Sequence, residues 1–360
     1  MKKLLFFLFG MLAFAYACTG ISFKTSDGGI IHARSIEYGE SDLNSKLVVS
    51  PRGKVYTSLL PNTKDVGMKW TSKYGFVGIS VIDEKFIAEG INEDGLNAGF
   101  FYFPKYGSLK RYNPKNKSKS IIDMQFITYL LSSYKNVDEV RANLSKIDIV
   151  NIAYDEKNEP LPTAHYRVAD ANGKNIVIEI IDGGKINIYD NKVGVLTNSP
   201  DYSWHVKNLN NYINLQPGNA NGYKVEGEEL FSFGVGTGAL GLPGDITPPS
   251  RFVRAFYYLS TMQTINDFQK GVKSAIHVLN NFDIPIWLEY GKEHQKYIPT
   301  NLLSATQWTS VSELTNKHFY YKTMKNEQLR KIDLKKIDFS KINYQVLTLD
   351  VEDGIKELSI

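Results

Sequence analysis

Cys18 is the residue best suited to chemistry in this chain, because it is the only cysteine and directly follows a processing signal. Residues 15–17 read Ala-Tyr-Ala, an A-x-A pattern typical of the site where a secretory leader is cleaved. Lysines 2 and 3 and the apolar stretch 4–14 complete such a leader, and the stretch is too short for a permanent membrane span. We therefore predict a signal peptide over residues 1–17 and a mature chain that begins at Cys18.

A cysteine at the amino terminus carries two reactive groups. Its α-amino group titrates near about 7.7 to 8 and its thiol near about 8.5, so one residue offers a nucleophile and a proton acceptor close to neutral pH. Such a residue needs no separate histidine. Cys18 is therefore the predicted nucleophile of an exported hydrolase.

Two other interpretations of Cys18 stay open. A lone cysteine is often a buried thiol without function. The cysteine after a cleavage site can also be lipidated in a membrane-tethered binding lipoprotein, although Ala15 and Tyr16 fit poorly where such leaders have Leu and a small residue. With a single cysteine, no intramolecular disulfide is possible.

The remaining composition excludes several classes of function. The six histidines are scattered without the spacing of a metal site, and no motif requires a metal or an organic cofactor. A cysteine–histidine pair formed across the fold stays open, because such pairs are adjacent in space rather than in sequence. The net charge of +4 includes both leader lysines, so the mature chain is nearly neutral and no nucleic acid or anionic membrane is expected as a partner.

Strand patterns form three blocks along the chain, separated by helical segments. Residues 19–23 and 30–34 predict a hairpin through the turn Ser-Asp-Gly-Gly at 26–29. Further strands are predicted over 74–81, 86–90, 96–101, 166–169, 176–181, 185–189 and 193–197, with the last four in one meander, and alternating segments at 307–314 and 318–323.

Helical spacing occupies the intervals between these strand blocks. Helices are predicted over 121–134, 137–144, 204–212, 250–260 and 266–280, a Gly- and Pro-rich loop over 234–249, and a peripheral tail after residue 325. Blocks of strands and helices in this order predict an α+β fold, with antiparallel sheets covered by helices, rather than a parallel βαβ sheet. No linker divides residues 18–360, which are expected to form a single domain.

Four motifs in this order resemble the choloylglycine hydrolases, the family of bile salt hydrolases and penicillin V acylases among the amino-terminal nucleophile (Ntn) hydrolases. The likeness spans nearly all of the mature chain. The motifs are Cys-Thr-Gly at 18–20 with Ala-Arg at 33–34, Gly-Ile-Asn-Glu-Asp-Gly-Leu at 90–96, Gly-Val-Leu-Thr-Asn-Ser-Pro at 194–200 with Trp-His at 204–205, and Gly-Leu-Pro-Gly-Asp at 241–245 with Pro-Ser-Arg-Phe at 249–252. The resemblance implies a four-layer αββα sandwich of two antiparallel sheets covered by helices.

The resemblance also implies roles for individual residues. Cys18 would attack a linear amide through an acyl-enzyme thioester, with its amine moving the proton to the leaving nitrogen. Arg34 would lie beside the thiolate and lower its pKa. Asn198 would donate to the oxyanion, and Arg251 would stabilise the site electrostatically.

Two positions depart from the family pattern. The family has an aspartate near the amino-terminal amine, and the corresponding residue is Glu37, one methylene longer; Asp27 in the hairpin turn is a poorer candidate. Tyr102 stands where many bile salt hydrolases have an asparagine at the oxyanion site and penicillin V acylases can have a tyrosine. A tyrosine hydroxyl or a backbone N–H can take that role.

The implied substrate has a bulky apolar acyl part and a small polar amine, such as a glycine- or taurine-conjugated bile acid. The aromatic run 100–103 is a candidate wall of the acyl pocket, and Phe101 is the residue of this run that we expect to contact substrate. The core of a strand explains the run equally well. Penicillin V and other N-acyl amides, such as acyl-homoserine lactones, are alternative substrates. The resemblance further suggests a homotetramer, and the leader suggests a periplasmic or secreted protein.

Overall fold

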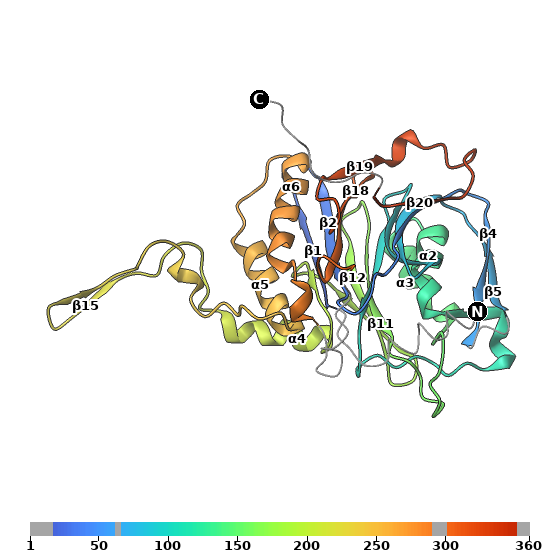
Figure 1. Ribbon diagram of the computed structural model, residues 1–360, viewed down its shortest axis with the longest axis horizontal. Coiled ribbons are helices and arrows are strands. Elements are labelled where there is room, and N and C mark those ends of the chain that lie inside the picture. The colour runs from blue at the N-terminus through green and yellow to red at the C-terminus, as the bar shows by residue number, and fades with distance from the viewer. Residues whose placement is uncertain (1–16, 62–65, 290–300, 351–360) are drawn as a thin grey trace.

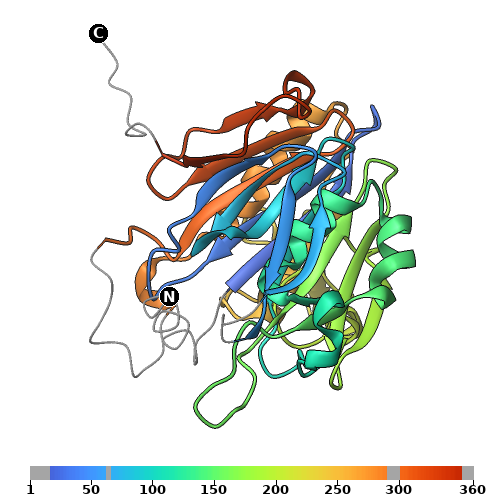
Figure 2. The ribbon, with the colours of Figure 1, turned by 90° about the vertical axis from the view of Figure 1, so that its right-hand side faces the viewer.

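The computed structural model describes residues 17–61, 66–289 and 301–350. Two antiparallel sheets lie face to face in it (Figures 1 and 2). The six-stranded sheet has the order β14 (Val195–Leu196), β1 (Ala17–Lys24), β2 (Ile30–Glu37), β17 (Thr306–Glu313), β18 (His318–Thr323) and β19 (Arg330–Asp333). The eight-stranded sheet has the order β13 (Lys185–Asp190), β12 (Asn175–Ile181), β11 (Ala164–Ala169), β8 (Asn97–Tyr102), β7 (Asp83–Asn92), β6 (Phe76–Val81), β3 (Lys46–Ser50) and β20 (Gln345–Thr348).

Helices cover the outer face of each sheet. The six-stranded sheet is covered by α5 (Pro248–Thr261) and α6 (Phe268–Leu279), which contact β1 and β2, while α4 (Tyr202–Asn208) lies at their foot (Figure 1). The eight-stranded sheet is covered by α2 (Asp123–Ser133), which packs on β7, and by α3 (Val137–Asn143). The arrangement is the expected αββα sandwich.

Smaller elements complete the chain. Paired strands form a hairpin of β4 (Val55–Leu59) and β5 (Val66–Thr71), a short parallel pair of β9 (Ser120–Ile122) and β10 (Asp148–Val150), and the tip of a long projecting arm, β15 (Tyr223–Val225) with β16 (Glu228–Leu230). The described residues also form the 3-10 turns η2 (Pro114–Lys119), η3 (Leu144–Lys146), η4 (Leu209–Tyr212), η5 (Thr237–Ala239), η6 (Asn280–Phe282), η7 (Ile286–Leu288) and η9 (Leu334–Lys336).

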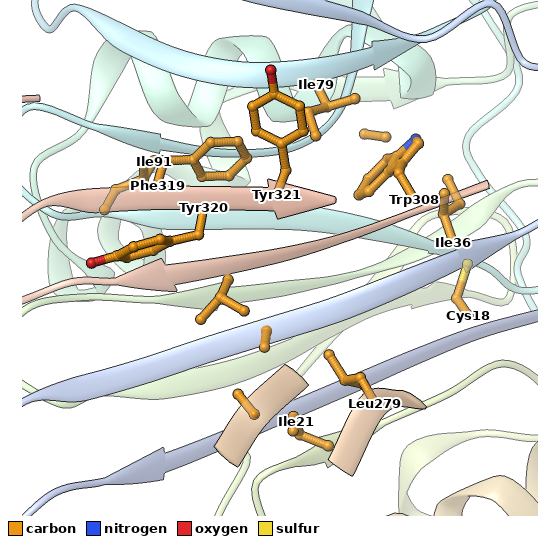
Figure 3. Close-up of a cluster of buried hydrophobic side chains, with 14 of the residues drawn as sticks. Cys18, Ile21, Ile36, Ile79, Ile91, Leu279, Trp308, Phe319, Tyr320 and Tyr321 are labelled. Atoms are coloured by element: carbon orange, nitrogen blue, oxygen red, sulfur yellow. The ribbon is translucent and has the colours of Figure 1, made fainter. Parts of the chain in front are cut away.

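Two large apolar clusters hold the layers together. One combines residues of both sheets with α5 and α6, and Figure 3 shows part of it, including Ile21, Ile79, Leu279 and Phe319. The other fills the space between the eight-stranded sheet and α2 and α3. Burial of such side chains contributes about 1.5 to 3 kcal/mol each relative to exposure, so these clusters fix which face of each strand points inward.

The predicted amino-terminal hairpin is confirmed and is longer than expected. β1 and β2 pair in antiparallel register from Ala17↔Glu37 to Lys24↔Ile30, and Gly28 in the turn takes a φ of 86°, a conformation that favours glycine. Asp27 lies in this turn, where its carboxylate accepts from the Phe268 N–H at the start of α6. The turn is at the opposite end of β1 from Cys18, so Asp27 is not the carboxylate near the amine.

The predicted meander was wrong in its last strand. Strands β11, β12 and β13 do pair consecutively, but β14 leaves their sheet and pairs with β1 instead, with Gly20 opposite Leu196. The turn before β14 contains Gly194 with a φ of 72°, packed closely on the Ser22 carbonyl. Local turn signals cannot reveal such a change of sheet, which depends on packing between distant segments.

The structure differs from expectation in three further features. Residues 121 and 122 lie in β9, and the helix begins only at Asp123. The tail after residue 325 is peripheral as predicted but supplies β19 and β20, the outer strands of the two sheets. Strands β3 to β5 were not predicted. Among the described helices, none has the length and apolarity needed to cross a bilayer.

Candidate active site

The β1–β2 register places Arg34 beside Cys18. Cys18 faces Ile36 and Gly20 faces Arg34 across the hairpin, and residues two apart on a strand point to the same side. Both side chains therefore enter the space between the sheets, where Arg34 Nη2 lies 2.8 Å from Cys18 Sγ. Figure 3 shows Cys18 at the margin of the apolar cluster, next to Ile36.

Arg34 is fixed by groups from the other sheet. Its Nη1 donates to the Phe100 carbonyl at 2.7 Å, its guanidinium lies 4.3 Å from the centre of the Phe101 ring, and Glu89 lies 3.9 Å away. Gly20 makes the close approach possible, because a Cβ there would come within 2.7 Å of the Phe101 ring. The Arg34 side chain is fully buried, so the cation is held in one position.

The electrostatic balance at the Cys18 sulfur differs from the expectation based on Arg34 alone. In the chain that still contains Ala17, burial raises the pKa of the Cys18 thiol, and Arg34 is the largest opposing influence. Glu37 adds to the increase and Arg251 opposes it. The cation lowers the pKa as predicted, but burial outweighs it.

Asn198 reaches Cys18 because β14 pairs with β1. Its side-chain Oδ1 accepts a hydrogen bond from the Cys18 backbone N–H at 2.9 Å, and its Nδ2 donates to the Tyr102 carbonyl at 2.9 Å. An amide NH₂ has two hydrogens, so a second N–H is available for a substrate oxyanion. The predicted donor is thus beside the predicted nucleophile.

Two histidines support the Asn198 segment, and sequence reasoning gave neither a role. His205 Nε2 lies 2.9 Å from the Asn198 carbonyl, and His165 Nε2 lies 2.9 Å from the Thr197 carbonyl. Burial lowers the pKa of His205 to about 4, and a carbonyl can only accept, so His205 donates as a neutral ring. Only its place in the Trp-His motif signalled His205; nothing local signalled His165. The sulfur of Cys18 accepts a hydrogen bond from Arg34 rather than from a histidine.

Arg251 projects from the first turn of α5 onto the start of β1. Its Nη1 donates to the Cys18 carbonyl at 2.5 Å and to Thr19 Oγ1 at 2.9 Å, and its Nη2 donates to Asn198 Oδ1 at 2.8 Å. The predicted residue therefore contacts both Cys18 and Asn198. It fixes the backbone of the nucleophile and orients the Asn198 amide.

Glu37 lies on the helix-covered side of the hairpin, opposite Ala17. Burial raises the pKa of its carboxyl to about 7, while Arg251, the Ser35 hydroxyl and Arg34 oppose that increase. A second buried carboxylate, Glu289, accepts from the Ala17 N–H at 2.9 Å. Sequence reasoning missed Glu289, which follows an apolar run without any recognisable motif.

A pocket with mostly apolar walls opens at Cys18. Strand alternation divides the aromatic run 100–103: Phe100 and Tyr102 line the pocket, whereas Phe101 points away from it and packs on Arg34. The prediction of Phe101 as a lining residue was therefore wrong. The lining comprises Cys18, Ile36, Leu43, Val81, Ile82, Phe100, Tyr102, Asp123, Met124, Ile152, Leu161, Pro162, Thr163 and Ala164.

Among the described residues of this lining, the carboxylate is that of Asp123, at the start of α2. It accepts from the Met124 and Ile152 N–H groups and from Thr163 Oγ1. Within residues 17–61, 66–289 and 301–350, no three His, Cys, Asp or Glu side chains gather in a way that could hold a metal ion.

An αββα sandwich with a cysteine at the start of its central hairpin, a guanidinium on the sulfur and an amide at the backbone nitrogen defines an Ntn amidohydrolase. Residues 18–353 match the model of the linear amide C-N hydrolases, choloylglycine hydrolase family. The chain belongs to this family, whose members hydrolyse linear amides.

Individual relatives agree with this assignment. The chain is 33% identical over 318 residues to a bile salt hydrolase/transferase from Clostridium perfringens, covering 88% of this chain and 92% of that protein. A crystal structure of a mutant conjugated bile acid hydrolase from the same organism matches with a TM-score of 0.77 at 29% identity, over 95% of this chain and 100% of the other. A penicillin V acylase from Agrobacterium tumefaciens matches with a TM-score of 0.73 at 25% identity, over 92% of each chain.

Proposed function

We propose that this enzyme removes glycine or taurine from conjugated bile acids, with Cys18 as the nucleophile. The observation that carries the proposal is the position of Cys18 in the lining of a pocket whose other walls are mostly apolar. A steroid acyl group is large and apolar and suits such walls, while its amide carbonyl can lie at the sulfur. The bile acid hydrolases among the relatives support the same substrate class.

The proposed reaction follows from the contacts of Cys18. The sulfur attacks the amide carbonyl carbon, and its proton passes to the α-amino group of the same residue. Asn198 Nδ2, held by the Tyr102 carbonyl, donates its second N–H to the resulting oxyanion. The tetrahedral intermediate collapses to a thioester as the leaving nitrogen takes the proton, and water then hydrolyses the thioester to release the bile acid.

A second substrate class is favoured by Tyr102. Tyr102 belongs to the pocket lining, and burial raises the pKa of its hydroxyl to about 12, so the hydroxyl stays protonated. Penicillin V and acyl-homoserine lactones are the alternatives on this ground. The structural match to a penicillin V acylase supports keeping them in the comparison.

A hydrolysis panel with the matured protein tests the substrate. We expect kcat/KM for glycocholate and taurocholate to exceed that for penicillin V and for an acyl-homoserine lactone by at least about tenfold, because a steroid fills more of an apolar pocket. We expect Cys18→Ala to abolish all four activities while the thermal unfolding temperature stays close to that of the wild type. Penicillin V as the preferred substrate, or turnover by Cys18→Ala, would overturn the respective part of the proposal.

Export of the protein is part of the same proposal. The leader falls on residues 1–17, of which 1–16 lie outside the described residues. Cleavage after Ala17 would give a periplasmic or secreted enzyme with a free amino-terminal amine. The burial of Cys18, 2% exposed with its sulfur on Arg34, supports a free thiol over a lipidated one. Intact mass spectrometry of the purified protein distinguishes the two.

We further propose that the enzyme is a homotetramer in which the projecting arm contacts a second copy. The strands at the tip of the arm pair only with each other in the described structure, and an isolated hairpin is at best marginally stable in water. Large apolar side chains are exposed along the arm: Ile213, Tyr223, Val225, Leu230, Phe231, Phe233, Val235 and Leu240. An element present on every copy suits a symmetric assembly.

The arm is tested by replacing Phe231 and Phe233, which are 68% and 94% exposed, with serine. We expect the double variant to shift from tetramer toward smaller species in light scattering coupled to size exclusion. Trp287→Ser, which removes an aromatic residue outside the arm that is 64% exposed, is the control. A monomeric wild type, or an unchanged tetramer in the double variant, would contradict the role of the arm.

A further inference from the structure

A small enclosed site surrounds the residue before Cys18. Ala17 is 5% exposed, and its methyl group belongs to an apolar cluster with Ile284 and Ala305. Its backbone N–H donates to Glu289 Oε1 at 2.9 Å. Gly39 permits the close approach of the Glu289 backbone, because a Cβ at Gly39 would lie 2.1 Å from the Glu289 carbonyl oxygen.

Two buried carboxylates flank this backbone position. Glu37 lies opposite Ala17 in the β1–β2 register, and Glu289 accepts from Ala17. Within the parts of the chain that the structure describes, neither oxygen of Glu37 accepts a hydrogen bond of good geometry, nor does Glu289 Oε2. Buried acceptors of this kind require donors.

Two guanidiniums, Arg251 and Arg34, act on these carboxylates within the described part of the chain. Of the buried guanidiniums, Arg34 and Arg167 both lie 3.9 Å from Glu89. Arg251 interacts electrostatically with both Glu37 and Glu289, while its Nη atoms donate to Cys18, Thr19 and Asn198. Neither the Arg251 nor the Arg34 guanidinium is hydrogen-bonded to Glu37, whose buried oxygens therefore still need a donor.

We propose that Glu289 and Glu37 together bind the α-ammonium group of Cys18 once Ala17 has been removed, and that Glu289 is a positioning residue for the nucleophile. The inference rests on the proposed function, because it requires Cys18 to be the first residue. An α-ammonium carries three N–H groups. Asn198 Oδ1 already accepts one N–H of this nitrogen, which leaves one for each carboxylate.

Removal of Ala17 frees both the space and the acceptor. Glu289 Oε1 loses its donor, the Ala17 N–H. The next nitrogen along the strand is that of Cys18, which lies within one residue spacing, about 3.8 Å, of the position of the Ala17 nitrogen. The space left by the Ala17 backbone lies between that nitrogen and the carboxylates. A rotation of the Glu289 side chain into this space makes the contact.

The expected consequence concerns the acidic side of the pH profile. A carboxylate beside an ammonium stabilises its charged form and raises its pKa, whereas the neutral amine accepts the thiol proton. Burial raises the pKa of Glu289 itself, with Glu37 adding to the increase and Arg251 opposing it. Among the described residues, Arg34, Asp283 and Glu40 also act electrostatically on Glu37 or Glu289.

The experiment measures kcat/KM against pH for the matured wild type and for Glu289→Gln. Without the negative charge of Glu289, the pKa of the Cys18 amine falls and a smaller fraction of the amine is protonated at low pH. We therefore expect the acidic limb of the kcat/KM profile to move about one pH unit lower. Glu313→Gln is the matched control: Glu313 is also buried but lies at the other end of β17, opposite Ile31 rather than Glu37, and its limb should not move. A purely structural role for Glu289 would lower the unfolding temperature without moving the limb.

Glu289→Asp keeps the test decisive if the glutamine variant does not fold. Because its carboxylate is withdrawn by one methylene, Glu289→Asp should move the acidic limb of the kcat/KM profile in the same direction as Glu289→Gln but by less. If the limb of the folded aspartate variant does not move, the inference is overturned. Intact mass spectrometry verifies that each variant begins at Cys18. Turnover by Cys18→Ala would overturn the proposed function instead, so the two failures are distinguishable.

Discussion

The guanidinium of Arg34 donates to the sulfur of Cys18 at 2.8 Å, although the two residues are 16 positions apart and each is buried. The hairpin register creates this contact, and Phe100, Phe101 and Glu89 of the opposite sheet hold the guanidinium in place. The reactive sulfur and its cation are therefore contributed by one hairpin and fixed by the second layer of the sandwich.

Arg34→Leu should weaken the nucleophile by raising the pKa of the thiol. A cation in contact lowers such a pKa by about one to three pH units, so its loss should decrease both the rate of Cys18 alkylation at pH 7 and kcat/KM by at least about tenfold. The pH dependence of iodoacetamide labelling measures this directly. Arg52→Leu removes an exposed guanidinium as a control. An unchanged labelling profile would contradict an electrostatic role for Arg34.

Asn198→Ala should lower kcat more than it alters KM, because the amide stabilises charge that develops only in the transition state. Loss of one such donor costs about 10²- to 10³-fold in kcat. Steady-state kinetics on a conjugated bile acid provide the measurement. Ser199→Ala, which removes only a bond to the Pro104 carbonyl, is a neighbouring control that should retain kcat within about tenfold. Equal kcat values for both variants would exclude the oxyanion role.

Phe100→Ala and Phe101→Ala should have different effects because the two rings lie on opposite faces of β8. Loss of the Phe100 ring from the pocket should raise KM for a steroid amide about tenfold. Loss of the fully buried Phe101 ring should lower the free energy of unfolding by about 3 to 5 kcal/mol and lower kcat by loosening Arg34. Chemical denaturation and steady-state kinetics separate these outcomes, and a matching pattern in both variants would refute the assignment of faces.

Asp123→Asn should change how stability depends on pH. Burial raises the pKa of this carboxyl from 3.8 to about 6, with Thr163 and the Met124 and Ile152 N–H groups opposing. A raised pKa means that the wild type loses stability as pH increases from about 4 through 6, by about 3 kcal/mol, and the asparagine variant lacks this loss.

Urea unfolding at pH 4, 5, 6 and 7 tests the effect of Asp123. The difference in free energy of unfolding between variant and wild type should move in favour of the variant over this interval. Asp138→Asn removes a carboxylate that is 64% exposed and should follow the wild type. Parallel curves for Asp123→Asn and the wild type would show that the buried carboxyl is not perturbed.

Local patterns by themselves determined a substantial part of this protein. The position of Cys18 after an A-x-A sequence, the hairpin turn at Gly28 and the periodicity of the helices depend on neighbouring residues, and the order of strand and helix blocks followed from them. Arg34, Asn198 and Arg251 entered through motifs that resemble a family, and all three meet at Cys18 in the structure.

Only the tertiary structure decided which distant segments meet. The transfer of β14 to the sheet of β1 brings Asn198 to the Cys18 nitrogen, and turn signals contain no information about that choice. Strand alternation put Phe100 rather than Phe101 into the pocket, but the face that became the pocket was set by the packing of one sheet on the other. Glu289 reaches the position before Cys18 across more than 270 residues, a contact that arises from burial and long-range packing rather than from any local pattern.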